Sequence, residues 1–294
     1  MKHLFITGAG RSGTTFLWRI LNNSPSVHLA TEIHYFSSLF HCGFLKNLKK
    51  QSRRNKVLTI DDIIHFIQTG NHFGMYWYNN RFFPDQEIRQ YFGNRKLNEK
   101  NIYEYLIEHD LKARAASKIN IKYIGEKTPL NIFHVRRLFK WFSDASILFI
   151  HRNPVHVLRS EVNKKRKPDY PMSKENPLYA YGLVIFVFFE WLLAGVIALY
   201  NKAVHKEKFI IVSYEDLTSH CESMVHRISS AIDIGYAEDL CAVKKFGSSY
   251  SNGNQKAYWY PPSWVVLLYS LFLHPLRILL NRVSLIHEET YLKS

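Results

Sequence analysis

A glycine-rich turn is the part of this sequence best suited to bind an anion. Its glycines let backbone N–H groups approach a ligand closely, and a helix that begins at the end of the turn adds a partial positive charge. An arginine and three hydroxyl groups supply further hydrogen-bond donors. The residues are Gly8, Gly10, Arg11, Ser12, Gly13, Thr14 and Thr15. We therefore predict that this turn holds a phosphate group.

The spacing of the turn is similar to the nucleotide-binding loop G-x-x-x-x-G-K-[ST], with Gly8 and Gly13 in place. Thr14 stands where that motif has lysine, and the cation of the turn is Arg11 instead. The missing lysine, which would reach the β- and γ-phosphates, argues against ordinary hydrolysis of ATP or GTP. A tight turn without a ligand is the alternative interpretation.

A second candidate anion site follows the apolar run 146–150. Arg152 comes just past this run, Asn153 is suited to cap a helix and Pro154 to begin it. Ser160 lies about two helical turns further on, on a face that can turn back toward Arg152. A guanidinium fork and a hydroxyl group can together grip one phosphate.

Both candidate sites lie between elements that alternate along the chain. Apolar runs predict strands at 3–7, 26–30, 121–125, 146–150 and 208–213. Helical periodicity covers 14–23, 60–69, 100–117, 130–142, 154–164, 177–204 and 220–232. This alternation predicts an α/β fold with a central parallel sheet in three α/β/α layers, similar to P-loop nucleotide-binding proteins. Ligands of such sheets bind beyond the carboxyl ends of the strands, where Arg11 and Arg152 fall.

Several motifs together make the chain resemble sulfotransferases that use 3′-phosphoadenosine 5′-phosphosulfate (PAPS). Residues 10–15 are similar to the family's 5′-phosphosulfate loop, and Arg152 with Ser160 is similar to its 3′-phosphate pair, including the separation. Glu-Ile-His-Tyr-Phe at 32–36 and Gly-Glu-Lys-Thr-Pro at 125–129 resemble motifs of the glycan-modifying, heparan-type branch. Arginine at position 11, where many members have lysine, also occurs in the protein-tyrosine branch. The matches run from residue 4 to about 217.

The resemblance implies a role for each matching residue. Residues 10–15 and the pair Arg152 and Ser160 would bind PAPS. Glu32 would be the base that deprotonates an acceptor hydroxyl, with His34 orienting it or the acceptor. Arg11 would stabilise the leaving phosphate, and Lys127 would reach the sulfuryl oxygens or the acceptor. We expect Glu126 to pair with a neighbouring cation, Ser248–Tyr250 to close over the donor, and no metal to be required.

Composition limits the partners and the location. The net charge of +15 and the pI near 9.6 favour anionic partners, and basic residues cluster at 46–56 and 164–167. Nothing in the sequence matches a zinc finger or an RNA-binding signature, so we do not expect nucleic acid. Three widely spaced cysteines give no disulfide framework and suggest a reducing compartment. With a strand at the N-terminus, we expect a cytoplasmic protein, alternatively one bound peripherally at the inner membrane surface.

Two apolar segments bear on that expectation. Residues 178–200 are long enough to span a bilayer, but they lie between motifs that must share one site, so we predict a buried helix. Residues 264–286 carry Pro275 and two arginines and are predicted either to lie on a membrane or to pack on the core. We expect one domain over 1–294, with 36–100 as an insertion on the acceptor side and 261–294 as an apolar helical segment.

Three functions fit the sequence. The first is transfer of a sulfuryl group from PAPS to a hydroxyl of a glycan, glycolipid or lipid-linked saccharide, or alternatively of a tyrosyl or small hydroxylated acceptor. The second is a nucleotide-dependent kinase, against which the missing lysine argues. The third is a peripheral membrane protein without enzymatic activity, for which the pattern of Arg11, Lys127, Arg152 and Ser160 would be accidental.

Overall fold

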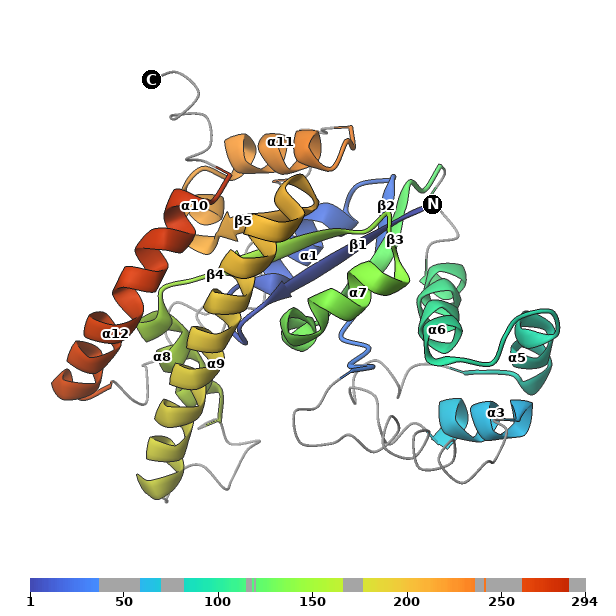
Figure 1. The fold of residues 1–294 in the computed structure, drawn as a ribbon, viewed down its shortest axis with the longest axis horizontal. Coiled ribbons are helices and arrows are strands. Elements are labelled where there is room, and N and C mark those ends of the chain that lie inside the picture. The colour runs from blue at the N-terminus through green and yellow to red at the C-terminus, as the bar shows by residue number, and fades with distance from the viewer. Residues whose placement is uncertain are drawn as a thin grey trace.

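The computed structural model describes residues 1–36, 59–69, 82–114, 118, 120–165, 177–235, 241 and 261–285. Five strands of this part of the chain form one parallel sheet with the order β2-β3-β1-β4-β5 (Figure 1). The strands are β1 (Lys2–Gly8), β2 (Val27–Thr31), β3 (Tyr123–Lys127), β4 (Ser146–His151) and β5 (Phe209–Ser213). All five lie within two residues of the predicted ranges.

Helices cover both faces of the sheet and complete the three-layer α/β/α fold (Figure 1). They are α1 (Thr14–Asn22), α3 (Ile60–Thr69), α5 (Asp85–Phe92), α6 (Glu99–Arg114), α7 (Val135–Trp141), α8 (Pro154–Lys165), α9 (Pro177–His205), α10 (Tyr214–Ser219), α11 (Cys221–Ala231) and α12 (Ser263–Arg282). Helices α1, α10 and α11 pack on the face that includes Leu4 and Ile6. Helices α6 to α9 and α12 pack on the face that includes Phe5. Alternate residues of each strand therefore serve two separate hydrophobic cores.

The strand register brings the predicted motifs to one edge of the sheet. Lys127 at the end of β3 lies opposite Ile6 of β1 and Thr31 of β2, and Gly8 lies opposite Ile150 of β4. The segments that follow β1, β2, β3 and β4 therefore begin side by side. Strand β1 lies where the strand order reverses, which is the position where ligands bind in open α/β sheets.

Two predicted regions differ in detail from the structure. The segment 130–142, predicted as one helix, is a 3-10 turn (Pro129–His134) followed by α7. Within 36–100, the predicted α3 is accompanied by a second helix, α5, and these pack on each other beside α6 (Figure 1). The aromatic residues at 73–78 and the basic cluster at 46–56 lie outside the described residues.

The prediction of a buried helix at 178–200 is only half correct. One face of α9 is buried, through Val187, Trp191 and Ala194, whereas the opposite face exposes Ile185 and Phe189. The helix is apolar all round, so its sequence carries no periodicity that distinguishes the two faces.

The cysteine spacing also did not predict that two of the cysteines lie in contact. Cys221 and Cys241 are free thiols whose sulfur atoms lie 2.6 Å apart. Their separation of twenty residues matches no local cysteine motif, so the sequence did not indicate this contact.

Candidate active site

The glycine-rich turn joins β1 to α1 as predicted, and its shape depends on glycine. Gly13 has a φ of 101°, a conformation that other residues rarely adopt, and it stands directly before the helix. A β-carbon on Gly13 would lie 2.2 Å from the ring of Tyr214, which follows β5. The turn therefore packs against the loop after another strand through backbone alone.

Several buried polar atoms of the described residues have no hydrogen-bond partner among them, and two of these atoms belong to the predicted anion-binding residues. They are Ser12 Oγ in the turn and Arg152 Nε beyond β4. Buried polar groups are nearly always hydrogen-bonded, so a pair of unsatisfied groups in a predicted anion site needs a physical explanation. A bound anion between the two loops would supply acceptors for both atoms.

The second loop is built as the sequence indicates. Asn153 Oδ1 accepts a hydrogen bond from the backbone N–H of Val155 at 3.0 Å and so caps α8. The backbone N–H of Asn153 donates to the Glu215 carboxylate at 2.9 Å. The Arg152 guanidinium lies 4.5 Å from the ring centre of Tyr214, the same ring that covers Gly13. Tyr214 thus joins the two loops.

Ser160, which the sequence analysis paired with Arg152, contacts the first loop. Its hydroxyl accepts a hydrogen bond from Arg11 Nε at 3.1 Å, and Glu161 lies 4.0 Å from the same nitrogen. The predicted pairing of Ser160 with Arg152 therefore has to include Arg11. Arg11 thus contacts α8, and Arg152 directly precedes the residue that caps this helix, so both arginines lie at the carboxyl edge of the sheet.

The candidate base is connected to this group through a buried lysine. Lys127 Nζ lies 2.5 Å from Glu32 Oε1 and donates a hydrogen bond to Thr15 Oγ1 at 3.1 Å. Lys127 is 2% exposed, whereas the Glu32 side chain is 36% exposed. His34 Nε2 lies 3.6 Å from the other Glu32 oxygen. The carboxylate is therefore open to solvent on one side and held by cationic or donor groups on the other.

These contacts set the protonation states at rest. Burial raises the pKa of Glu32, but the hydrogen bond from His34 and the attraction to Lys127 outweigh it and hold this pKa at about 2. Burial lowers the pKa of Lys127, and the Glu32 carboxylate partly restores it. Glu32 is thus a carboxylate at neutral pH, and a weak base as long as both neighbours hold it.

Three of the predicted site residues have an unusual backbone conformation. Arg11, Glu32 and His34 have φ angles of 62°, 47° and 56°. Non-glycine residues are rarely found in this left-handed region, and they persist there where the surrounding structure holds them. Among the described residues only three others share it, namely Asn120, Lys206 and Asp233. The strain is concentrated in the loops after β1 and β2.

Glu126 pairs with no cation among the described residues, contrary to the sequence-based expectation. It is fully buried and accepts hydrogen bonds from neutral donors only among its described contacts: the Tyr103 hydroxyl, Asn131 Nδ2 (2.7 Å), Thr128 Oγ1 (2.8 Å) and the backbone N–H of Ile33 (3.0 Å). Burial and the nearby Glu126 carboxylate raise the pKa of Tyr103 well above its usual value. Because Ile33 lies between Glu32 and His34, Glu126 positions the loop that carries both.

Two neighbouring residues of α9 hold the two anion-binding loops, and the sequence analysis missed both. The backbone N–H of Gly10 donates to Glu190 Oε1 at 2.7 Å, and Trp191 Nε1 donates to the backbone carbonyl of Arg152 at 2.9 Å. Burial raises the pKa of Glu190, against the effect of the Gly10 hydrogen bond. The feature of the sequence that could have indicated this role is Glu190, the single carboxylate inside the apolar run 178–200.

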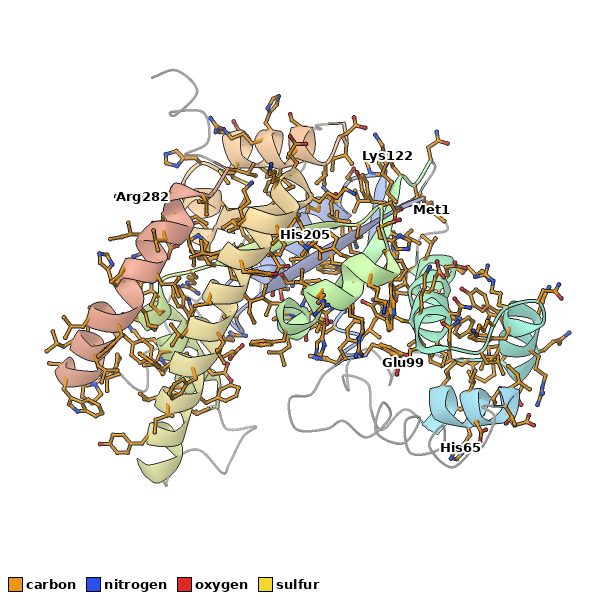
Figure 2. The ribbon with its side chains drawn as sticks, viewed as in Figure 1. Met1, His65, Glu99, Lys122, His205 and Arg282 are labelled. Atoms are coloured by element: carbon orange, nitrogen blue, oxygen red, sulfur yellow. The ribbon has the colours of Figure 1, made fainter. Side chains whose placement is uncertain are left out.

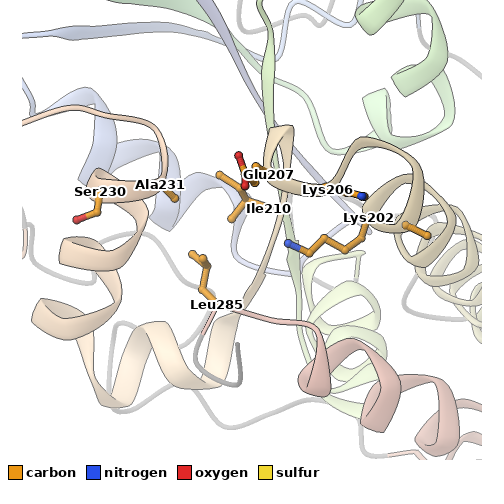
Figure 3. Close-up of a pocket in the computed structure, with 8 residues that line it drawn as sticks. Lys202, Lys206, Glu207, Ile210, Ser230, Ala231 and Leu285 are labelled. Carbon is orange, nitrogen blue, oxygen red and sulfur yellow. The ribbon is translucent and has the colours of Figure 1, made fainter. Parts of the chain in front are cut away.

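A cavity of about 610 Å³ lies away from these residues (Figure 3). Lys202, Lys206, Glu207, Ile210 and Ser230 are among the residues that line it. Ile210 is the second residue of β5, so the cavity lies at the amino edge of the sheet, opposite the candidate site. None of the predicted site residues lines it. Ser248–Tyr250 lie outside the described residues.

Comparison with known proteins agrees with this geometry. The family described as "Sulfotransferase family" matches residues 3–238. The fold is similar to the sulfotransferase domain of the Synechococcus PCC 7002 olefin synthase (TM-score 0.52, 14% identity, covering 93% of this chain and 94% of that one). It is also similar to sulfotransferase STF1 from Mycobacterium tuberculosis H37Rv (TM-score 0.50, 14% identity, covering 93% and 76%). No curated protein matches the chain. The matched region spans both loops and the predicted site residues from Gly10 to Ser160, and the chain belongs to the sulfotransferase family.

Proposed function

We propose that this sulfotransferase moves the sulfuryl group of PAPS to a hydroxyl group of a glycan, glycolipid or lipid-linked saccharide. The observation that carries the proposal is the position of Lys127, which contacts both Glu32 and Thr15. Through this one side chain the candidate base is placed beside the candidate phosphosulfate loop. No step requires a metal ion in this scheme, because fixed cations lie where negative charge would develop.

The donor would lie across the two loops at the carboxyl edge of the sheet. The backbone N–H groups of residues 12–15 and the Arg11 guanidinium would hold the 5′-phosphosulfate. Arg152 and Ser160 would hold the 3′-phosphate. The Ser160 hydroxyl can donate to this phosphate while it accepts from Arg11, because a hydroxyl group does both. The unsatisfied Ser12 Oγ and Arg152 Nε fit this placement.

The transfer itself is a displacement at sulfur. The acceptor oxygen forms a bond to sulfur as the bond from sulfur to the 5′-phosphate oxygen breaks, and the acceptor proton passes to Glu32. Adenosine 3′,5′-bisphosphate leaves with its new charge stabilised by Arg11. The sulfuryl oxygens would draw Lys127 away from Glu32, which would raise the basicity of the carboxylate when donor is bound.

The choice of acceptor follows the motifs around the base. Residues 32–36 and 125–129 resemble those of glycan-modifying sulfotransferases, and the apolar helix α12 favours an acceptor carried on a lipid. Arg11 favours the second candidate, a tyrosyl or small hydroxylated acceptor, because the protein-tyrosine branch has arginine in the same loop. Competition between glycans, glycolipids and phenols for one labelled donor would distinguish these classes.

Calorimetry with adenosine 3′,5′-bisphosphate, compared with ATP, tests the donor. We expect the bisphosphate to bind and ATP to bind far more weakly, because Arg152 and Ser160 require a 3′-phosphate. Equal binding of both nucleotides, or preference for ATP, would contradict the proposal.

A further inference from the structure

Helices α9 and α12 lie side by side and run in the same direction (Figure 1). The rings of Tyr181 and Trp264 stack near their amino ends, with centroids 6.2 Å apart. Further along, the Tyr269 hydroxyl donates to the backbone carbonyl of Val184 at 2.6 Å. The same contacts fix which faces of the two helices point outward.

The outward faces form one apolar surface. On α9, Ile185, Phe189 and Leu193 are 59%, 54% and 51% exposed at a spacing of four residues. On α12, Leu267 and Leu271 are 60% and 63% exposed. Figure 2 shows side chains of both helices projecting away from the sheet. Soluble monomers rarely leave so many large apolar side chains together in water, so this α9–α12 face indicates an interface.

Both helices are long and apolar enough to cross a membrane by length and composition. Their inner faces argue for another arrangement. Glu190 and Trp191 of α9 hold the backbone of Gly10 and Arg152, and α12 packs on α9 through Tyr269. A helix with these contacts cannot also be surrounded by lipid. The described contacts therefore leave only the outer faces available to a membrane.

Charge indicates what covers the α9–α12 face. Arg282, which ends α12, is exposed, and Lys202 and Lys206, which also line the cavity at the amino edge of the sheet, lie at the carboxyl end of α9 or just after it. The stacked Tyr181 and Trp264 at the other end are the residue types that favour the interface between lipid and water. With a net charge of +15, a second copy of this chain would be repelled, whereas an anionic lipid surface would be attracted.

We propose that the α9–α12 face docks on a membrane that contains anionic phospholipids, with both helices lying along its surface. The inner side of α9 holds the donor-binding loops, so the candidate site would lie about one helix diameter, about 10 Å, from the lipid. This proposal does not depend on the sulfotransferase reaction.

Flotation of the full chain with vesicles tests the proposal. One set of vesicles contains phosphatidylcholine and about one third phosphatidylserine, and the other contains phosphatidylcholine alone. The variant Leu193→Gln/Leu271→Gln makes the face polar, and Phe82→Gln is the matched control because Phe82 is 81% exposed outside this face. Binding of adenosine 3′,5′-bisphosphate and the thermal transition show whether each variant is folded.

We expect the wild type to bind the anionic vesicles, and to bind them less strongly at high salt or without phosphatidylserine. The double variant should bind at least about tenfold more weakly, and the control should be unchanged. The variant Arg282→Gln should bind anionic vesicles about fivefold more weakly, the effect of one cation near the lipid surface. Equal vesicle binding by the wild type and the apolar-face variant would overturn the proposal. So would a wild type that binds no vesicles, or one that forms dimers which the double variant dissociates.

Discussion

The substitution Glu32→Gln tests the proposed base most directly. Glutamine keeps the size of the side chain but removes the charge that lies 2.5 Å from Lys127 Nζ, and it cannot accept the acceptor proton. A general base contributes about 10²–10⁴-fold to a rate, so we expect kcat to fall at least about a hundredfold. This corresponds to about 2.7 kcal/mol of transition-state stabilisation. Donor binding should be retained, since Arg152 and the backbone of the first loop are untouched.

Two measurements are needed for this variant. Transfer of a radiolabelled sulfuryl group to a panel of glycans, glycolipids and phenols gives the rate, and calorimetry with adenosine 3′,5′-bisphosphate gives donor affinity. The matched control is Glu207→Gln, because Glu207 is exposed at the opposite edge of the sheet. Full activity of Glu32→Gln would remove Glu32 from the mechanism. A large loss of donor affinity would show that Glu32 acts mainly by holding Lys127.

The pH dependence of kcat/KM further distinguishes Glu32 acting as the base from Glu32 acting by holding Lys127. With its pKa held at about 2, Glu32 is already ionised in the free enzyme at every pH above about 4. An acid limb of kcat/KM near pH 6 that disappears in Glu32→Gln would therefore refute our description of the resting site. The Glu32 carboxylate raises the pKa of Lys127, so its removal should move the alkaline limb of the residual activity to lower pH.

The lowered pKa of Glu32 also predicts that the stability of the fold depends on pH. The folded-state pKa of Glu32 is depressed below the ordinary value of 4.5, so its contribution to stability is present above about pH 4.5. This contribution should be lost as the pH falls toward 2. Denaturant titrations of the wild type and Glu32→Gln should therefore converge over this range. A stability difference that stays constant down to pH 2 would contradict the lowered pKa.

Substitutions at three further positions test the loops. Arg152→Ala should weaken binding of adenosine 3′,5′-bisphosphate by about 1.5–3 kcal/mol in calorimetry, the effect of a lost charged hydrogen bond. Gly13→Ala should lower the free energy of unfolding by at least about 1–3 kcal/mol, because its φ is 101° and its β-carbon would lie 2.2 Å from a tyrosine ring. Glu190→Ala leaves the Gly10 N–H without its acceptor and should weaken donor binding, whereas Glu190→Gln keeps an acceptor and should preserve it.

The Gly13 and Glu190 variants each have a control within the chain. Gly182→Ala serves for Gly13→Ala, because nothing lies within 4 Å of a β-carbon at position 182 of α9. Equal stability of the two alanine variants would show that the turn can relax. Unchanged donor affinity in Arg152→Ala would contradict the 3′-phosphate site. Equal donor binding by the alanine and glutamine variants of Glu190 would show that its hydrogen bond to the first loop is unimportant.

Much of the site could be predicted because its parts are local in sequence. The turn after β1 carries its glycines and hydroxyls within eight residues, and Asn153 caps α8 two residues from its partner. The order of strands and helices follows from apolar runs and helical periodicity, which need no tertiary information. These are also the features that the resemblance to sulfotransferases uses.

Several contacts that the sequence analysis did not predict join distant segments. The hydrogen bond between Ser160 and Arg11 joins residues 149 positions apart. Glu126 was expected beside a cation, but its position in the buried β3 places it among neutral donors. The exposed half of α9 was missed because burial depends on the neighbour that covers each face, and this helix is apolar on every face.

The sequence by itself determined the α/β order, the glycine-rich turn between β1 and α1, and the types of residue in the two loops. Only the tertiary structure decided that Lys127 joins Glu32 to Thr15, and that α9 holds both loops on one side while exposing apolar residues on the other. The physical reason is that local backbone preferences are encoded by neighbouring residues. Side-chain pairing, burial and pKa depend instead on which segments the parallel sheet brings together at its carboxyl edge.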